Sequence, residues 1–140
     1  FDFGFIPSTL GGDGDPLDVL ILMEEPAFPG CVVSARLIGV IEANQTDGEG
    51  TERNDRLIAV AAEFHTHSEV RAISDLSENL IDEIEHFFIS YHQIRGKQFE
   101  PLGRFGPDRA EAIVKEGMKN FRKARRQSKK SDRRKKSRKG

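Results

Sequence analysis

The chain has 140 residues, enough for one domain with a hydrophobic core. Its apolar runs are far shorter than the roughly 18 residues that a membrane-spanning helix needs, so we expect no membrane partner. Its single cysteine, Cys31, excludes an internal disulfide and suits a reducing compartment, which favours a cytoplasmic protein.

The formal net charge of −1 conceals two parts of opposite charge. From Lys119 to the end there are 13 Lys and Arg residues and a single acidic residue, Asp132, so this part has a net charge of +12. The first 118 residues have 22 acidic and 9 basic side chains, which gives −13. Because residues 126–140 contain no apolar side chain, we expect a basic, disordered tail over residues 122–140.

The first half of the chain has the pattern of β-strands. Phenylalanines at positions 1, 3 and 5 alternate with Asp2 and Gly4, which is the two-residue period of a strand. Further strands are predicted over residues 19–23, 32–41 and 57–62. Between the last two lies a polar loop rich in glycine and acidic residues.

The second half changes to a helical period. The apolar residues between Leu80 and Tyr91 recur at three- and four-residue spacing, Ser77 is a suitable N-cap, and Gly96 lies beyond the end. A second helix is predicted to begin near Pro107. Strands followed by helices predict an α+β fold, with a small, mostly antiparallel sheet or barrel and two helices packed outside it.

Three aspartates lie within six residues of the segment GGDGDPLDVLIL: Asp13, Asp15 and Asp18. They come just before a buried strand, and no Lys or Arg precedes Arg36. Two carboxylates about 4 Å apart repel each other by some 4 kcal/mol at an effective dielectric constant near 20. Water, a basic neighbour or a cation must therefore compensate this charge.

Three explanations fit such a cluster. The commonest is a solvated acidic turn. A calcium loop is the second, since Glu24 is twelfth from Asp13, but Leu17 and Asp18 occupy its fifth and sixth positions, where a ligand and a glycine are required. The third is a magnesium site, because Mg²⁺ takes few carboxylates, keeps several waters and shares a phosphate substrate.

The segment DGDPLD resembles the signature of the family I soluble inorganic pyrophosphatases, D-x-D-P-x-D followed by an apolar residue. Further segments of the family pattern follow in order: PG at 29–30, GVI at 39–41, DRLIAV at 55–60 and IEHFFISYHQIRGK at 84–97. The resemblance implies an OB-like barrel with two outer helices and a catalytic domain over residues 1–121. It also implies Mg²⁺-dependent hydrolysis of pyrophosphate by a metal-activated water.

The resemblance also implies roles for the acidic residues. Asp13 and Asp18 correspond to Mg²⁺ ligands, and Asp15 to the base that helps deprotonate a metal-bridging water. For the third Mg²⁺ ligand, matching the strand to the family pattern without a gap selects Asn54. A small gap in the alignment selects Asp55 instead. We favour Asp55, because a carboxylate binds Mg²⁺ more strongly than an amide oxygen does.

Three further residues correspond to phosphate-binding positions: Arg56, Tyr91 and Lys97. Arg56 stands where the family usually has lysine, and an arginine can hold phosphate in a bidentate grip. Phe3 replaces a tyrosine of the family pattern, and His92 replaces a lysine, so the phosphate-binding set differs from that pattern at several positions.

The family has earlier barrel strands that carry further active-site residues, and the resemblance implies that this chain is either a fragment that begins after them or a reduced relative with an incomplete site. We therefore expect the 140-residue piece by itself to be weakly active or inactive. The resemblance implies a homo-oligomer. The alternative is a catalytically impaired relative that binds RNA or another polyanion through the basic tail.

Overall fold

The structure is a computed structural model, which describes residues 1–63 and 65–139. This part of the chain forms six strands, two α-helices and one short 3₁₀ turn, Ile73–Asp75, between the fifth strand and the first helix. The strands are β1 (Asp2–Ile6), β2 (Leu17–Leu22), β3 (Ala35–Asp47), β4 (Gly50–Arg53), β5 (Arg56–Ala61) and β6 (Gln98–Phe105). The helices are α1 (Glu78–Ile94) and α2 (Pro107–Arg138).

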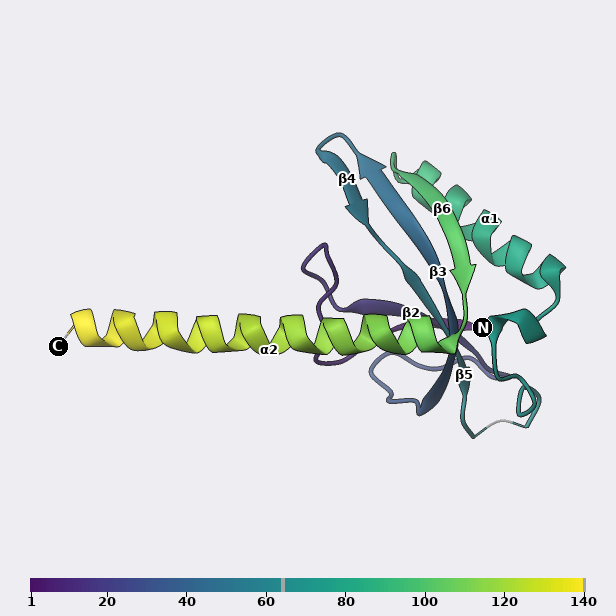
Figure 1. Cartoon of the computed structure of the whole chain (residues 1–140), viewed down its shortest axis with the longest axis horizontal. Coiled ribbons are helices and arrows are strands. Elements are labelled where there is room, and N and C mark those ends of the chain that lie inside the picture. Colours follow the sequence, from purple (N-terminus) through teal and green to yellow (C-terminus); the bar gives the residue numbers. More distant parts are fainter. Residues whose placement is uncertain (64, 140) are drawn as a thin grey trace.

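The six strands form one mixed sheet in the order β1-β2-β5-β3-β4, and β6 also pairs with β3 (Figure 1). Only β2 and β5 pair in parallel; the other pairs are antiparallel. The predicted α+β class is confirmed, whereas the sheet of the described residues is open and does not close into a barrel. β1 forms one edge, because it pairs with β2 alone.

Two strands were absent from the sequence-based prediction. All four residues of β4 are exposed, so this strand has no apolar alternation, and it forms because the turn at Gly48 folds it back on β3. β6 contains Pro101 and Gly103, which normally argue against a strand, and it pairs with β3 across an irregularity between Glu42 and Ala43.

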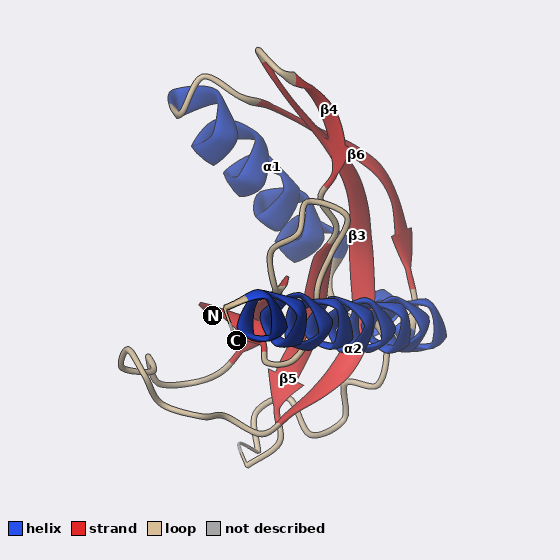
Figure 2. Cartoon of the chain, turned by 90° about the vertical axis from the view of Figure 1, so that its left-hand side faces the viewer, coloured by secondary structure: helices blue, strands red, loops and turns tan. Residues whose placement is uncertain are grey.

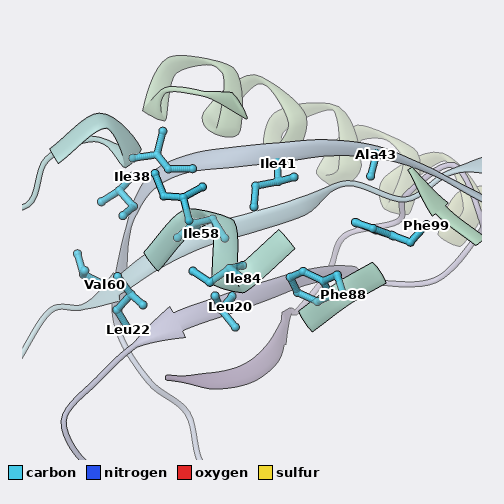
Figure 3. Packing of buried hydrophobic residues seen from close by; sticks show 12 residues of the cluster. Leu20, Leu22, Ile38, Ile41, Ala43, Ile58, Val60, Ile84, Phe88 and Phe99 are labelled. Atoms are coloured by element: carbon cyan, nitrogen blue, oxygen red, sulfur yellow. The ribbon is translucent and has the colours of Figure 1, made fainter. Parts of the chain in front are cut away.

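The helices cover both faces of the sheet (Figure 2). α1 packs on one face, where Ile84 and Phe88 meet Leu20, Ile41 and Ile58 (Figure 3). The first turns of α2 cover the other face, where Ala110 joins a cluster with Val19, Val40, Leu57 and Ala59. All six residues of β5 are therefore buried, which explains its continuous apolar sequence from Leu57 to Ala61, after Arg56.

The tail is helical, contrary to the sequence-based expectation of disorder. α2 continues without interruption to Arg138, and its second half extends away from the body as a single helix (Figure 1). The expectation rested on the lack of apolar residues, but residues 122–138 also lack Gly and Pro and are rich in Lys and Arg, which favour helix. Among the described residues, none of the helices is both long and apolar enough to span a membrane.

Candidate active site

The aspartate loop before β2 is fixed to the body at both ends. Thr9, which is fully buried, donates its hydroxyl to the Ile6 carbonyl (2.6 Å) and accepts the Leu17 amide (3.1 Å). The Leu10 amide donates to the Gly117 carbonyl of α2 (3.0 Å). The positions of the loop aspartates therefore depend on both the sheet and α2.

The tip of this loop is a tight turn. The Gly11 amide donates to the Asp15 carbonyl (2.8 Å), and the Asp15 amide donates to Asp13 Oδ1 (3.0 Å). Gly14 has a φ of 81°, a left-handed conformation that an L side chain rarely adopts. The glycine between the two aspartates is therefore needed for the turn that brings Asp13 and Asp15 together.

Three of the predicted residues line one small cavity, which we call the acidic cavity. It has a volume of about 200 Å³ and lies between the aspartate loop, the start of β5 and α2. Asp13, Asp18 and Asp55 line it, together with Asn54 and Arg53. Carboxylates from two distant segments of the chain thus line the same cavity.

Asp55 is held by two donors. Its Oδ1 accepts the Ala43 amide (3.1 Å) and Arg53 Nε (2.6 Å). The hydrogen bond to Asp55, together with the charges of Asp55 and Glu42, raises the pKa of Arg53. Asn54 donates its side-chain amide to Gln45 (2.6 Å). Since Asn54 and Asp55 both line the acidic cavity, the choice of Asp55 as third ligand stays a prediction.

Glu42 is a charged residue of this region that the sequence analysis missed. It lies in the middle of β3 with only 6% of its surface exposed, and it forms ion pairs with Arg53 and with Arg109 of α2 (2.6 Å to Arg109). The signal was present, because a lone acid interrupts the apolar run of β3. Glu42 links the sheet to α2 beside the acidic cavity.

A second, larger cavity adjoins the first, and we call it the aromatic cavity. It has a volume of about 390 Å³ and is lined by Phe3, Phe87, Tyr91, Arg56 and Asp18, among others. Asp18 lines both cavities. The Asp18 carboxylate therefore lies between the other aspartates and two side chains, Arg56 and Tyr91, that the resemblance implies bind phosphate.

Arg56 is a buried cation with an incomplete set of partners. It is 8% exposed, forms an ion pair with Asp18, and lies over the Phe88 ring at 5.1 Å from the ring centroid. Its Nη2 contacts His92 Nε2 at 3.2 Å. Its Nε is buried with no hydrogen-bond partner among the described residues. The hydrogen bonding of this guanidinium is therefore incomplete.

His92 orients Arg56 from α1. Its Nδ1 donates to the Phe88 carbonyl (2.7 Å), which leaves the Nε2 lone pair of the neutral ring to accept Arg56 Nη2. Burial lowers the pKa of His92, and the positive charges of Arg56, Lys97 and Arg95 lower it further, against the opposing effect of the Phe88 carbonyl. The folded protein thus holds this imidazole in its neutral form.

This lowered pKa predicts a pH-dependent stability. An unfolded histidine takes up a proton near pH 6.5, whereas folded His92 does so at lower pH. The unfolded state therefore binds more protons below pH 6.5, and the free energy of unfolding falls as pH decreases, by up to about 1.4 kcal/mol per pH unit. Urea denaturation of His92→Gln should show a shallower slope between pH 5 and 6.5. His86→Gln, at an exposed position of the same helix, should retain the slope; equal slopes in all three proteins would contradict this role.

Of the remaining predicted residues, Tyr91 lines a cavity, whereas Asp15 and Lys97 do not. Asp15 is exposed and lines neither cavity, although it adjoins Asp13 in the same turn. Lys97 lies 3.9 Å from Asp47 at the end of β3 and also lines neither cavity. Tyr91 lines the aromatic cavity, and its hydroxyl accepts a hydrogen bond from Arg95 (2.6 Å).

Arginine partners compensate much of the aspartate charge. Asp18 pairs with Arg56 and Asp55 with Arg53. Within the described residues, no three His, Cys, Asp or Glu side chains are close enough to form a preformed metal cage. The donors nevertheless fit Mg²⁺ in type, because this ion takes one or two carboxylate oxygens and fills its other positions with water and phosphate.

Comparisons with known proteins identify the family and the fold. A family model described as inorganic pyrophosphatase matches residues 1–122. An inorganic pyrophosphatase of Synechocystis sp. is 40% identical over 121 residues, which are 86% of this chain and 69% of that protein. One of Geobacillus stearothermophilus is 39% identical over 115 residues, covering 82% and 67% of the two chains.

Solved structures agree with these sequence matches. The inorganic pyrophosphatase of Helicobacter pylori superimposes with a TM-score of 0.78 at 35% identity, over 86% of this chain and 70% of that one. The enzyme of Thermus thermophilus gives 0.78 at 34% identity, over 86% and 69%. Since the matched residues include both cavities, the family pattern predicted from DGDPLD is confirmed, and this chain belongs to the inorganic pyrophosphatase family.

Proposed function

We propose that the protein is an Mg²⁺-dependent inorganic diphosphatase, which hydrolyses pyrophosphate to two phosphates in the cytoplasm. Membership of the family gives the reaction class. The structural observation that supports it most is the position of Asp18, which lines both the acidic cavity and the aromatic cavity. The proposed metal-binding region and the proposed phosphate-binding region are therefore adjacent and share one carboxylate.

The acidic cavity is the proposed cation site, with Asp13, Asp18 and Asp55 as the residues that would hold Mg²⁺. When bound, Mg²⁺ supplies neutralising charge and lowers the pKa of a coordinated water. Asp18 and Asp55 must share their carboxylates with Arg56 and Arg53, so we propose that cation binding weakens these two ion pairs. Weakening the first of them frees the guanidinium of Arg56 for the substrate.

The basic and hydroxyl groups act on the phosphate side. Arg56 can donate two parallel hydrogen bonds to phosphate oxygens, a geometry that stabilises charge on the departing phosphate. The Tyr91 hydroxyl at the same cavity donates a further hydrogen bond. Lys97 acts as a more distant positive charge. Its weak contact with Asp47 leaves it free to move toward an anion.

Asp15 is the proposed general base. Its exposed carboxylate accepts the proton of the attacking water, and the hydrogen bond from its own amide to Asp13 fixes its position beside that side chain. No covalent intermediate is needed, because the water attacks phosphorus directly.

We expect Asp15→Asn to lower the rate of phosphate release from Mg-pyrophosphate by about 100-fold or more, because an amide cannot accept this proton. The measurement uses the protein in its natural full length. Thermal unfolding should be nearly unchanged, since the side chain is exposed. Glu83→Gln removes one exposed charge on α1, away from both cavities, and should leave the rate unchanged. An unaltered rate in Asp15→Asn would show that this residue is not the base.

We also propose that the protein forms a homo-oligomer, as the family resemblance implies.

A further inference from the structure

The second half of α2 is a separate, strongly cationic feature. The last hydrogen bond from α2 to the body among the described residues is donated by Asn120 to the Leu10 carbonyl (3.5 Å). From Arg122 to Lys139 every residue is exposed, and the helix extends freely from the body (Figure 1). The match to the family model ends at residue 122, so all but the first residue of this segment lies beyond it.

The charges on this helix are confined largely to one side. At 3.6 residues per turn, ten basic residues fall on one half of the helix surface, which we call the cationic face. They are Lys119, Arg122, Lys123, Arg125, Arg126, Lys129, Lys130, Arg133, Arg134 and Lys136. The opposite half continues the body-facing row of Ala110 and Gly117 and carries mainly small or polar residues, with two cations, Lys135 and Arg138, near its end.

A cationic face of this density needs a partner of opposite charge. Arg122, Arg126, Lys130 and Arg134 follow one another at four-residue spacing, so each repels the next along the helix. Asp132 is the single acidic residue beyond residue 118. A polyanion aligned with the helix would remove this repulsion and gain affinity by releasing its condensed counterions.

The composition and shape of the helix select one class of polyanion. Ala124 is the only apolar residue after Phe121, which gives no apolar face for insertion into a bilayer. No aromatic side chain is present after Phe121 for stacking on single-stranded bases. A helix about 10–12 Å wide fits the B-DNA major groove of about 12 Å, whereas the major groove of A-form RNA is too narrow.

We propose that the cationic face of α2 binds the phosphate backbone of double-stranded DNA without sequence preference. The face covers 18 residues, or about 26 Å of helix, along which duplex DNA presents one phosphate charge per ~1.7 Å of its axis. The body carries a net charge of −13 and is repelled by the same DNA, so α2 alone makes the contact and both cavities stay open to solvent. This binding does not depend on the proposed hydrolysis.

The test is fluorescence anisotropy of a labelled 30-base-pair duplex titrated with the complete protein at several salt concentrations. We expect affinity that falls steeply with salt. Arg126→Gln/Lys130→Gln removes two charges from the centre of the cationic face. It should weaken binding roughly tenfold or more and make the log–log salt slope shallower by about 2.

The matched control is Lys135→Gln/Arg138→Gln, which changes the net charge equally but on the opposite half of the helix. It should leave affinity within about twofold of the parent protein, and circular dichroism should show equal helix content in both variants, because Gln, Lys and Arg have similar helix propensity. Equal weakening by the two pairs, absence of duplex binding, or tighter binding to single-stranded RNA or phosphatidylserine vesicles would each overturn the proposal.

Discussion

Asp18→Asn is expected to lower phosphate release from Mg-pyrophosphate by about 10²- to 10³-fold, the size of loss seen when one preorganised electrostatic group is removed. Asp18 is the one predicted metal ligand that lines both cavities. The amide removes the negative charge that attracts Mg²⁺ and also the ionic partner of Arg56. The substitution therefore affects both sides of the proposed site, which no other single aspartate does.

Two further measurements separate this effect from loss of structure. The Asp18 side chain is 53% exposed, so thermal unfolding should change little, while Mg²⁺ binding measured by calorimetry without substrate should weaken. Glu83→Gln serves again as the control for loss of one surface charge. Normal Mg²⁺ affinity in Asp18→Asn would refute its assignment as a ligand, even if the rate fell.

The sequence predicted those elements whose residues carry their own periodicity. The strands β1, β2 and β5 and the helix α1 were placed within about two residues, because their alternation or helical spacing is set by burial on one or two faces. β4 and β6 lack such a signal, since their pairing is determined by β3. The helical tail was missed for a related reason: its residues favour helix individually but pack on nothing.

Part of the candidate site was predictable as residues, since Asp13, Asp18 and Asp55 line one cavity, but its contacts were not predictable. DGDPLD and DRLIAV identified the residues that meet at the acidic cavity. The ion pair of Arg56 with Asp18 joins residues 38 positions apart, and Arg109 reaches Glu42 across 67 positions. These partners depend on the register of β2 against β5 and on the docking of α2, which no local pattern encodes.

Gly39→Ala should cause the largest loss of stability among the substitutions considered. Gly39 lies in β3 at an irregularity in its pairing with β5. A Cβ atom here would lie 2.5 Å from the Phe105 carbonyl oxygen and 2.8 Å from Ile73 Cβ. The Phe105 oxygen is a backbone atom and Ile73 Cβ is bonded directly to the backbone, so neither atom can move away by side-chain rotation. We expect the free energy of unfolding to fall by about 3 kcal/mol.

The reason for this sensitivity also connects the fold to the site. Phe105 ends β6 two residues before α2 begins at Pro107, so a displaced β6 end would shift the helix that supports the aspartate loop through Gly117. Gly48→Ala is the matched control, since a Cβ there meets nothing within 4 Å, and it should change stability by about 0.5 kcal/mol or less. Urea denaturation of both variants measures the difference; comparable stability of the two would mean that β3 and β6 separate at Gly39 without cost.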